Sequence, residues 1–129
     1  MSNRPLSPHL SVYRFKYTLF SSILNRATGL VLAVGLVILA YWLMALASGP
    51  ESYATAGMVL AHPVFKLIYA GLVFTFSYHL VAGIRHLIWD TGRFMEKRQS
   101  QVSAWLVVAI SIVITLALLG WAFTRTGAA

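Results

Sequence analysis

Two histidines and an aspartate lie in one largely apolar segment of the chain and form a single stripe if that segment is helical. A helix turns about 100° per residue, so His86 lies about 20° short of two full turns from His79, and Asp90 about 20° past three turns. Gly83, about 40° away from His79, belongs to the same stripe. Ionisable groups in an apolar helix are costly and usually face protein or a cavity. The stripe is therefore the face best suited to chemistry.

His79 is the deep member of the stripe, about 10 residues or roughly 15 Å from the polar end of its segment. A neutral imidazole at that depth needs partners for its nitrogens. A haem iron is one such partner, since His is a standard axial ligand, and Gly83 leaves room for a flat macrocycle. The stripe alone leaves a second interpretation open, a histidine hydrogen-bonded to a serine or to the backbone of a neighbouring helix.

His86, Asp90 and Arg85 lie near the end of the same segment. His86 and Asp90 are one helical turn apart and can pair directly, although the spacing by itself favours a simple pair of charges at a helix end. Arg85 lies about 120° off the stripe. In that position it can meet haem propionates, an adjacent subunit or a lipid phosphate.

Ser22 and Arg26 form a second polar pair one helical turn apart, ahead of the first apolar stretch. A hydroxyl and a guanidinium at a membrane surface can hydrogen-bond a quinone carbonyl or a propionate. On spacing alone, the favoured interpretation is that Arg26 is a topology anchor and Ser22 a local cap.

The composition excludes several classes of protein. Of the 129 residues 59% are hydrophobic and only 10% charged, which is more apolar surface than one small soluble core can bury. The net charge of +7 does not indicate nucleic-acid binding, because the basic residues lie at the ends of apolar stretches rather than in one patch. There is no cysteine, so any metal must be held by His or oxygen ligands.

Three stretches without Asp, Glu, Lys or Arg are each long enough to cross a bilayer, which takes roughly 20 residues. These stretches are 27–50, 67–84 and 99–124. No segment alternates as the strands of a membrane barrel do. We expect one all-α membrane domain over 1–129, a bundle of three transmembrane helices in the lipid bilayer. The predicted helices cover about 22–47, 63–89 and 101–124, and residues 17–26 either begin the first helix or lead into it.

The basic residues predict the orientation of the chain. They gather before the first span and after the second, so the positive-inside rule puts the N-terminus in the cytoplasm and the C-terminus outside. Residues 1–8 show neither the apolar region of a signal peptide nor an Arg-rich transit peptide. These features favour a bacterial protein of the inner membrane.

Three blocks of the sequence resemble the cytochrome b anchor subunit family of succinate dehydrogenase. Residues 79–92, HLVAGIRHLIWDTG, match the family pattern H-x3-G-x-R-H-x3-D-x-G at every fixed position. Residues 4–10, RPLSPHL, and 22–29, SILNRATG, also match, and the three blocks keep the family's order. The block at 79–92 is the most specific of the three.

The resemblance implies a role for each candidate residue. His79 would ligate haem b, and Ser22 and Arg26 would line a ubiquinone site. Arg26 and His86 would lie near the haem propionates, and Asp90 near the cytoplasmic rim of the quinone pocket. One departure concerns Asn25, where some members of the family carry His, so any role of that His does not transfer to this chain.

The resemblance also implies a set of partners. A second membrane anchor subunit would supply the other axial His, an iron–sulfur subunit would relay electrons, and an FAD flavoprotein would oxidise succinate. Electrons would reach quinone in the respiratory chain and the tricarboxylic acid cycle. Two alternatives remain at this point: a fumarate reductase anchor, and a non-redox membrane scaffold subunit.

Overall fold

A computed structural model describes residues 17–126, which form four α-helices and no strand. They are α1 (Tyr17–Ala47), α2 (Pro50–Leu60), α3 (Pro63–Asp90) and α4 (Lys97–Thr126). Three of them, α1, α3 and α4, are long and apolar enough to cross a membrane. The predicted all-α membrane protein with three spans is thereby confirmed. The block at 4–10 lies outside the described residues.

The spans extend beyond their apolar centres. α1 begins at Tyr17, so Ser22 and Arg26 lie within one continuous helix rather than at its start. α3 begins at Pro63, where a missing N–H costs nothing, with the His62 side chain accepting a hydrogen bond from the Val64 N–H (3.3 Å). It ends before Gly92, whose φ of 76° suits glycine.

The short helix α2 is absent from the sequence prediction. It begins at Pro50, after Gly49 turns the chain with a φ of 106°, and ends at Leu60. A search for apolar stretches long enough to span a bilayer overlooks a helix of this length. α2 connects the far end of α1 to the start of α3.

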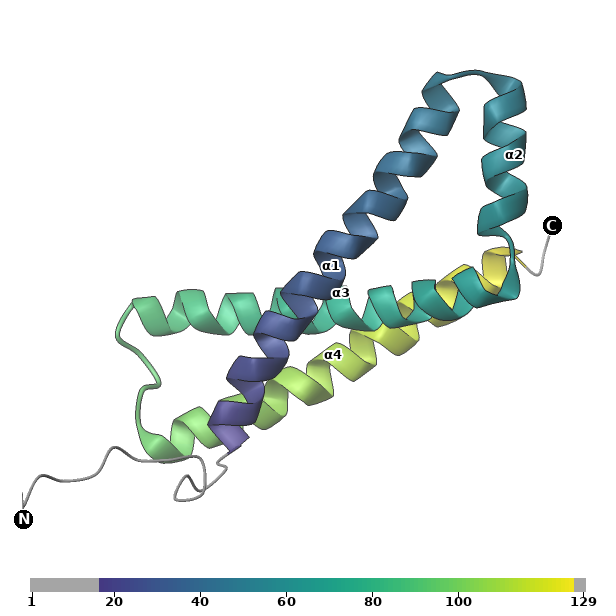
Figure 1. Ribbon diagram of the computed structural model, residues 1–129. Coiled ribbons are helices and arrows are strands. Elements are labelled where there is room, and N and C mark those ends of the chain that lie inside the picture. Colours follow the sequence, from purple (N-terminus) through teal and green to yellow (C-terminus); the bar gives the residue numbers. More distant parts are fainter. Residues whose placement is uncertain (1–16, 127–129) are drawn as a thin grey trace, which may run out of the picture.

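The three long helices cross near the middle of α3 (Figure 1). α3 and α4 run side by side in opposite directions, joined by the turn 91–96. The first half of α1 crosses both of them, whereas its second half diverges, and α2 closes a triangle with α1 and α3. The core at the crossing is small and contains Tyr78, Ala82 and Val107.

Small and hydroxyl-bearing residues make the close contacts between helices, as is common in membranes. Ser77 and Ser111 are fully buried, and the Ser111 hydroxyl donates to the carbonyls of Val107 (2.6 Å) and Ser77 (3.4 Å). A Cβ at Gly35 would lie 2.7 Å from Leu72 Cδ2, so glycine allows α1 to approach α3 there. Packing therefore depends on close backbone approach rather than on a large apolar core.

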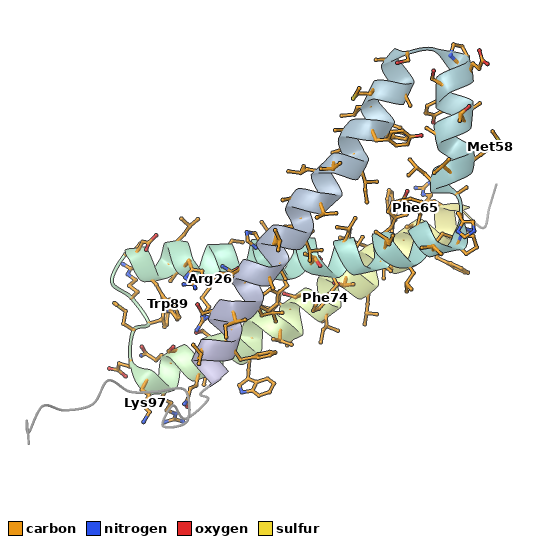
Figure 2. All side chains as sticks on the ribbon, in the orientation of Figure 1. Arg26, Met58, Phe65, Phe74, Trp89 and Lys97 are labelled. Carbon is orange, nitrogen blue, oxygen red and sulfur yellow. The ribbon has the colours of Figure 1, made fainter. Side chains whose placement is uncertain are left out.

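Large apolar side chains cover the outside of the helices (Figure 2). On the second half of α1, Leu36, Val37 and Met44 are each more than 60% exposed. Such a surface is stable only against lipid or other apolar helices. It is the surface expected of a transmembrane subunit.

Candidate functional site

His79 lies where α3 crosses the first half of α1, and its ring is held by residues of α1. Its Nδ1 lies 3.2 Å from the carbonyl oxygen of Asn25 and 3.2 Å from the Thr28 hydroxyl. That hydroxyl in turn donates to the Asn25 carbonyl at 2.9 Å. Both contacts reach the same nitrogen of the imidazole.

These contacts assign the tautomer of His79. A carbonyl oxygen only accepts, so the 3.2 Å contact with Asn25 favours the tautomer that carries its proton on Nδ1. The Thr28 proton is used on the same carbonyl, so its oxygen is an acceptor for Nδ1–H as well. In the neutral ring Nε2 then carries the lone pair. No residue in 17–126 forms a hydrogen bond with Nε2, which leaves this nitrogen available as a ligand.

Glycine makes this approach of the two helices possible. A Cβ at Gly29 would lie 3.2 Å from His79 Cε1, tighter than ordinary contact. Thr28 itself is buried. Helical periodicity places Gly29 beside Ser22 and Arg26 but does not reveal that Thr28 and Gly29 contact His79. The only sequence signal for this contact is that both end the block 22–29.

The other side of His79 opens outward. A Cβ at Gly83 would meet nothing within 4 Å, and His86 is exposed. Within the described part of the chain no group of three or more His, Cys, Asp or Glu side chains could hold a metal. His86 is seven residues further along α3, roughly 10 Å from His79, too far to share one small site with it. The chain therefore offers one imidazole to a group that approaches from outside.

Ser22 and Arg26 lie one turn apart on α1, half-exposed and exposed respectively. Neither makes a hydrogen bond or ion pair with any other residue described by the structure, so the predicted proximity of Arg26 to His86 is not realised as a bond. Beside them, Asn25 Oδ1 is buried without a hydrogen-bond partner among the described residues. These polar groups on α1 are available to a ligand or another subunit.

His86 and Asp90 do not pair. No ion pair joins the two residues, and the His86 ring instead packs edge-on against Trp89, with ring centroids 5.4 Å apart at 83°. Asp90 is exposed at the end of α3. Both residues are exposed on α3 and do not form the direct contact that their spacing allows.

Arg85 differs from the sequence interpretation, which placed it among propionates, another subunit or lipid. It is only 7% exposed and points into the junction of α1, α3 and α4. Its Nε donates to Ser103 Oγ (2.9 Å), Nη1 to Ser21 Oγ (3.2 Å) and Nη2 to the Ser100 carbonyl (2.9 Å). Its guanidinium carbon also lies 3.8 Å from the centre of the Trp89 ring. A buried cation needs such partners, and here they are hydroxyls, a carbonyl and a π face.

Comparison with known proteins identifies the family of the chain. Residues 1–118 match the model of the succinate dehydrogenase/fumarate reductase transmembrane subunit family. The chain belongs to this family. It is 39% identical over 114 residues to the succinate dehydrogenase cytochrome b556 subunit of Paracoccus denitrificans, covering 88% of each chain.

Other relatives extend the family likeness. The cytochrome b556 subunit of Rickettsia felis is 35% identical over 117 residues, with 91% of each chain covered. The mitochondrial cytochrome b560 subunit of Sus scrofa is 33% identical over 119 residues, covering 91% of this chain and 70% of the relative. As a member of the succinate dehydrogenase/fumarate reductase transmembrane subunit family, this chain is a multi-pass membrane subunit of an electron-transport enzyme complex.

Proposed function

We propose that this chain is the haem b- and ubiquinone-binding membrane anchor of a bacterial succinate:quinone oxidoreductase in the inner membrane. The observation that carries the proposal is the state of His79. Its Nδ1 lies 3.2 Å from two oxygens of α1, and no described residue forms a hydrogen bond with its Nε2. A histidine that ligates a metal usually donates its other N–H in this way, which fixes both tautomer and ring orientation.

The residues present fit one side of a haem site. His79 Nε2 would hold the iron, and the open surface beside Gly83 would face the macrocycle. When bound, the haem supplies one-electron transfer. Asn25 and Thr28 orient the imidazole, and the exposed His86 would face the propionates. The second axial His would come from a second anchor subunit, because no other His of α3 or α4 lies at the depth of His79.

The quinone site would lie on α1 at the cytoplasmic surface. Arg26 offers planar, permanently charged donors for a carbonyl that gains negative charge on reduction, and Ser22 a smaller donor one turn away. The buried Asn25 Oδ1 is an acceptor without a donor, which suits a hydroxyl of the reduced quinone. Asp90 would lie at the cytoplasmic rim of this site.

The chain itself would not oxidise succinate. An FAD flavoprotein would carry out that reaction and an iron–sulfur subunit would pass the electrons on, while this chain provides anchoring, binding and electrostatics. The exposed apolar surface of α1 supports docking against the second anchor subunit and lipid.

A fumarate reductase anchor remains the second candidate, since the family description includes both enzymes. Comparing succinate:ubiquinone reductase with menaquinol:fumarate reductase activity of the purified complex decides between them. Family membership gives no support to a non-redox scaffold subunit.

The central experiment replaces His79 with Leu in the whole complex. The dithionite-reduced spectrum should lose its haem b band or show it strongly weakened, while the subunit still inserts. His62→Asn is the matched control, because Asn keeps a side-chain acceptor at the start of α3 and lies away from the site. A His79→Leu spectrum equal to that of the unmodified complex would show the ligand assignment to be wrong.

A further inference from the structure

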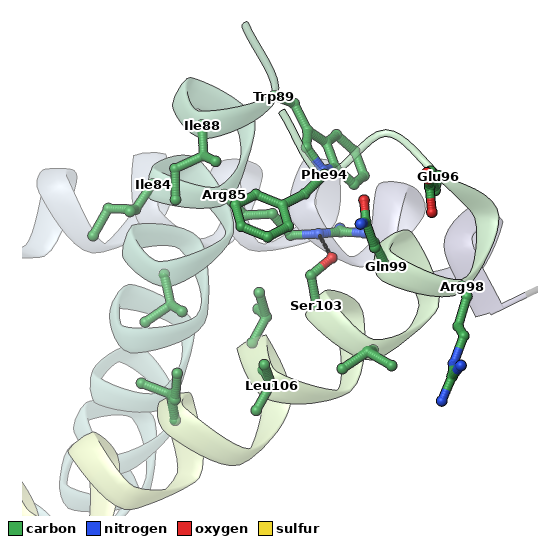
Figure 3. A pocket seen from close by; sticks show the side chains of 14 residues that line it. Ile84, Arg85, Ile88, Trp89, Phe94, Glu96, Arg98, Gln99, Ser103 and Leu106 are labelled. Atoms are coloured by element: carbon green, nitrogen blue, oxygen red, sulfur yellow. Dashed lines mark hydrogen bonds between the residues drawn. The ribbon is translucent and has the colours of Figure 1, made fainter. Parts of the chain in front are cut away.

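A hollow of about 630 Å³ between α3 and α4 is separate from the proposed haem and quinone residues (Figure 3). Ile84 and Ile88 of α3 and Leu106 and Ile110 of α4 contribute to its apolar wall. On α4 it extends from residue 98 to residue 110, roughly 18 Å along the helix. None of His79, Ser22 and Arg26 lines it. It is therefore a long apolar groove that needs its own explanation.

The polar end of the groove lies at the turn 91–96. Figure 3 shows Trp89, Phe94 and Gln99 gathered around Arg85 there, while Glu96 of the turn and Arg98 of α4 lie farther out. The groove thus has one polar end at the edge of the predicted span and an apolar length that runs into it. This is the profile of an amphipathic molecule aligned with the membrane normal.

The indole N–H of Trp89 specifies the chemistry at the polar end. Trp89 Nε1 is buried and has no hydrogen-bond acceptor in the described chain. An indole nitrogen only donates, and an unmatched buried donor costs about 1–3 kcal/mol. The Arg85 guanidinium carbon lies 3.8 Å from the centre of the same ring. An acceptor that carries negative charge would satisfy the indole and also be attracted by the guanidinium.

The surrounding charges also favour an anion. Four basic residues occur between 85 and 98, against the two acids Asp90 and Glu96. Of the basic residues, Arg93, Lys97 and Arg98 are exposed around the turn. Basic pockets between transmembrane helices at the cytoplasmic surface typically bind anionic lipid head groups.

We propose that the groove between α3 and α4 binds one anionic phospholipid. A phosphate oxygen accepts the Trp89 Nε1 proton, Arg98 turns toward the head group, and an acyl chain lies along the apolar wall. The lipid would stabilise the turn 91–96 and the splayed start of α4. This proposal needs only the membrane placement of the family and does not depend on haem or quinone binding.

The binding test uses the purified whole complex, stripped of lipid in detergent and titrated with phosphatidylglycerol or phosphatidylcholine, with bound lipids counted by native mass spectrometry. We expect one phosphatidylglycerol to be retained well below the concentration at which phosphatidylcholine binds. Trp89→Phe should weaken it about tenfold through loss of one charge-assisted hydrogen bond, and Arg98→Gln about fivefold. Trp121→Phe, at an exposed tryptophan of α4 far from the turn, should leave binding unchanged.

A second measurement identifies the occupant without relying on the folding of these variants. A photoreactive phenylalanine analogue in place of the exposed Leu106 should form an adduct with phospholipid in native membranes. A cross-link to another subunit instead of lipid would overturn the proposal, as would displacement of the lipid by ubiquinone. Equal affinity for phosphatidylglycerol and phosphatidylcholine would overturn the anionic assignment. Since neither measurement depends on the haem band, failure here is distinguishable from failure of the proposed function.

Discussion

Thr28 orients His79 through one hydroxyl that serves two partners, donating to the Asn25 carbonyl and accepting from the imidazole. Thr28→Val keeps the shape and removes both bonds, at a cost of about 1 kcal/mol in stability. The imidazole then donates less and becomes a weaker electron donor, so we expect the haem midpoint potential to rise by tens of millivolts. Thr28→Ser, which retains the hydroxyl, should stay near the original potential. An unaltered potential in Thr28→Val would show that the hydroxyl only fills space.

Arg26 belongs to the proposed quinone site and has no bond within the described chain, so its loss should affect activity rather than stability. Arg26→Leu should lower quinone reductase activity about 10- to 100-fold, the equivalent of one charge-assisted hydrogen bond. Succinate oxidation with a dye that accepts electrons upstream should survive. Arg26→Lys keeps the charge but not the planar donors, so its quinone reductase activity should lie between that of Arg26→Leu and that of the unmodified complex.

The two activities separate the explanations for Arg26. A parallel fall of dye and quinone reduction would mean failed assembly, which the haem spectrum would also reveal. Unchanged quinone reduction would leave Arg26 as a topology anchor only.

At this scale the sequence predicts residue types better than contacts. His79 is recognisable from its depth and stripe, but one of its two partners is the backbone carbonyl of Asn25, which no pattern of side chains reveals. The sequence offered propionates, an adjacent subunit or lipid phosphate as partners of Arg85, because periodicity describes direction around one helix and not the helix that packs there. Ser21, Ser100 and Ser103, which bind Arg85, stand out only once α1, α3 and α4 are placed together.

Among the elements, the junction of α1, α3 and α4 depends on Arg85. Arg85→Gln should remove the bonds from α3 to α1 and α4 and destabilise the assembled subunit by about 2 kcal/mol or more. The loss of haem absorbance on heating the complex measures this effect. We expect its midpoint temperature to be several degrees lower in the variant than in the unmodified complex. Arg125→Gln is the matched control, because Arg125 is exposed and lies 6.0 Å from the Trp121 ring. Equal melting of both variants would contradict a role of Arg85 in holding the junction.

The bounds of a helix were predicted best where Pro or Gly marks its ends. α3 has Pro63 at one end and Gly92 just beyond the other, and its bounds agree with the prediction within a residue. α1 begins at Tyr17, as one of the two interpretations of residues 17–26 expected. α4 begins earlier than predicted, because polar residues at a membrane surface continue a helix although they end an apolar stretch. α2 was missed because its eleven residues are too few to span lipid.

For the whole molecule, the orientation in the membrane is a prediction that rests on charge. Arg85, Arg93, Lys97 and Arg98 lie near the turn between α3 and α4, while Lys66 and Arg125 lie at the opposite end. A C-terminal alkaline phosphatase fusion should therefore be active, because that enzyme works only outside the cytoplasm. A fusion inserted after Gly92 should be inactive. The reverse pattern at normal expression would show that the chain is oriented the other way.

The open side of His79 has a consequence for how the enzyme is made. In the proposed function a lone chain would supply only His79 to the haem, and the second His ligand would come from the partner anchor subunit. Haem absorbance would then appear only in membranes where both anchor subunits have assembled, so it would report on their pairing. Cells that make this subunit in excess should accumulate inserted copies without haem. The ratio of haem to protein would give the fraction of subunits that have assembled with the second anchor subunit.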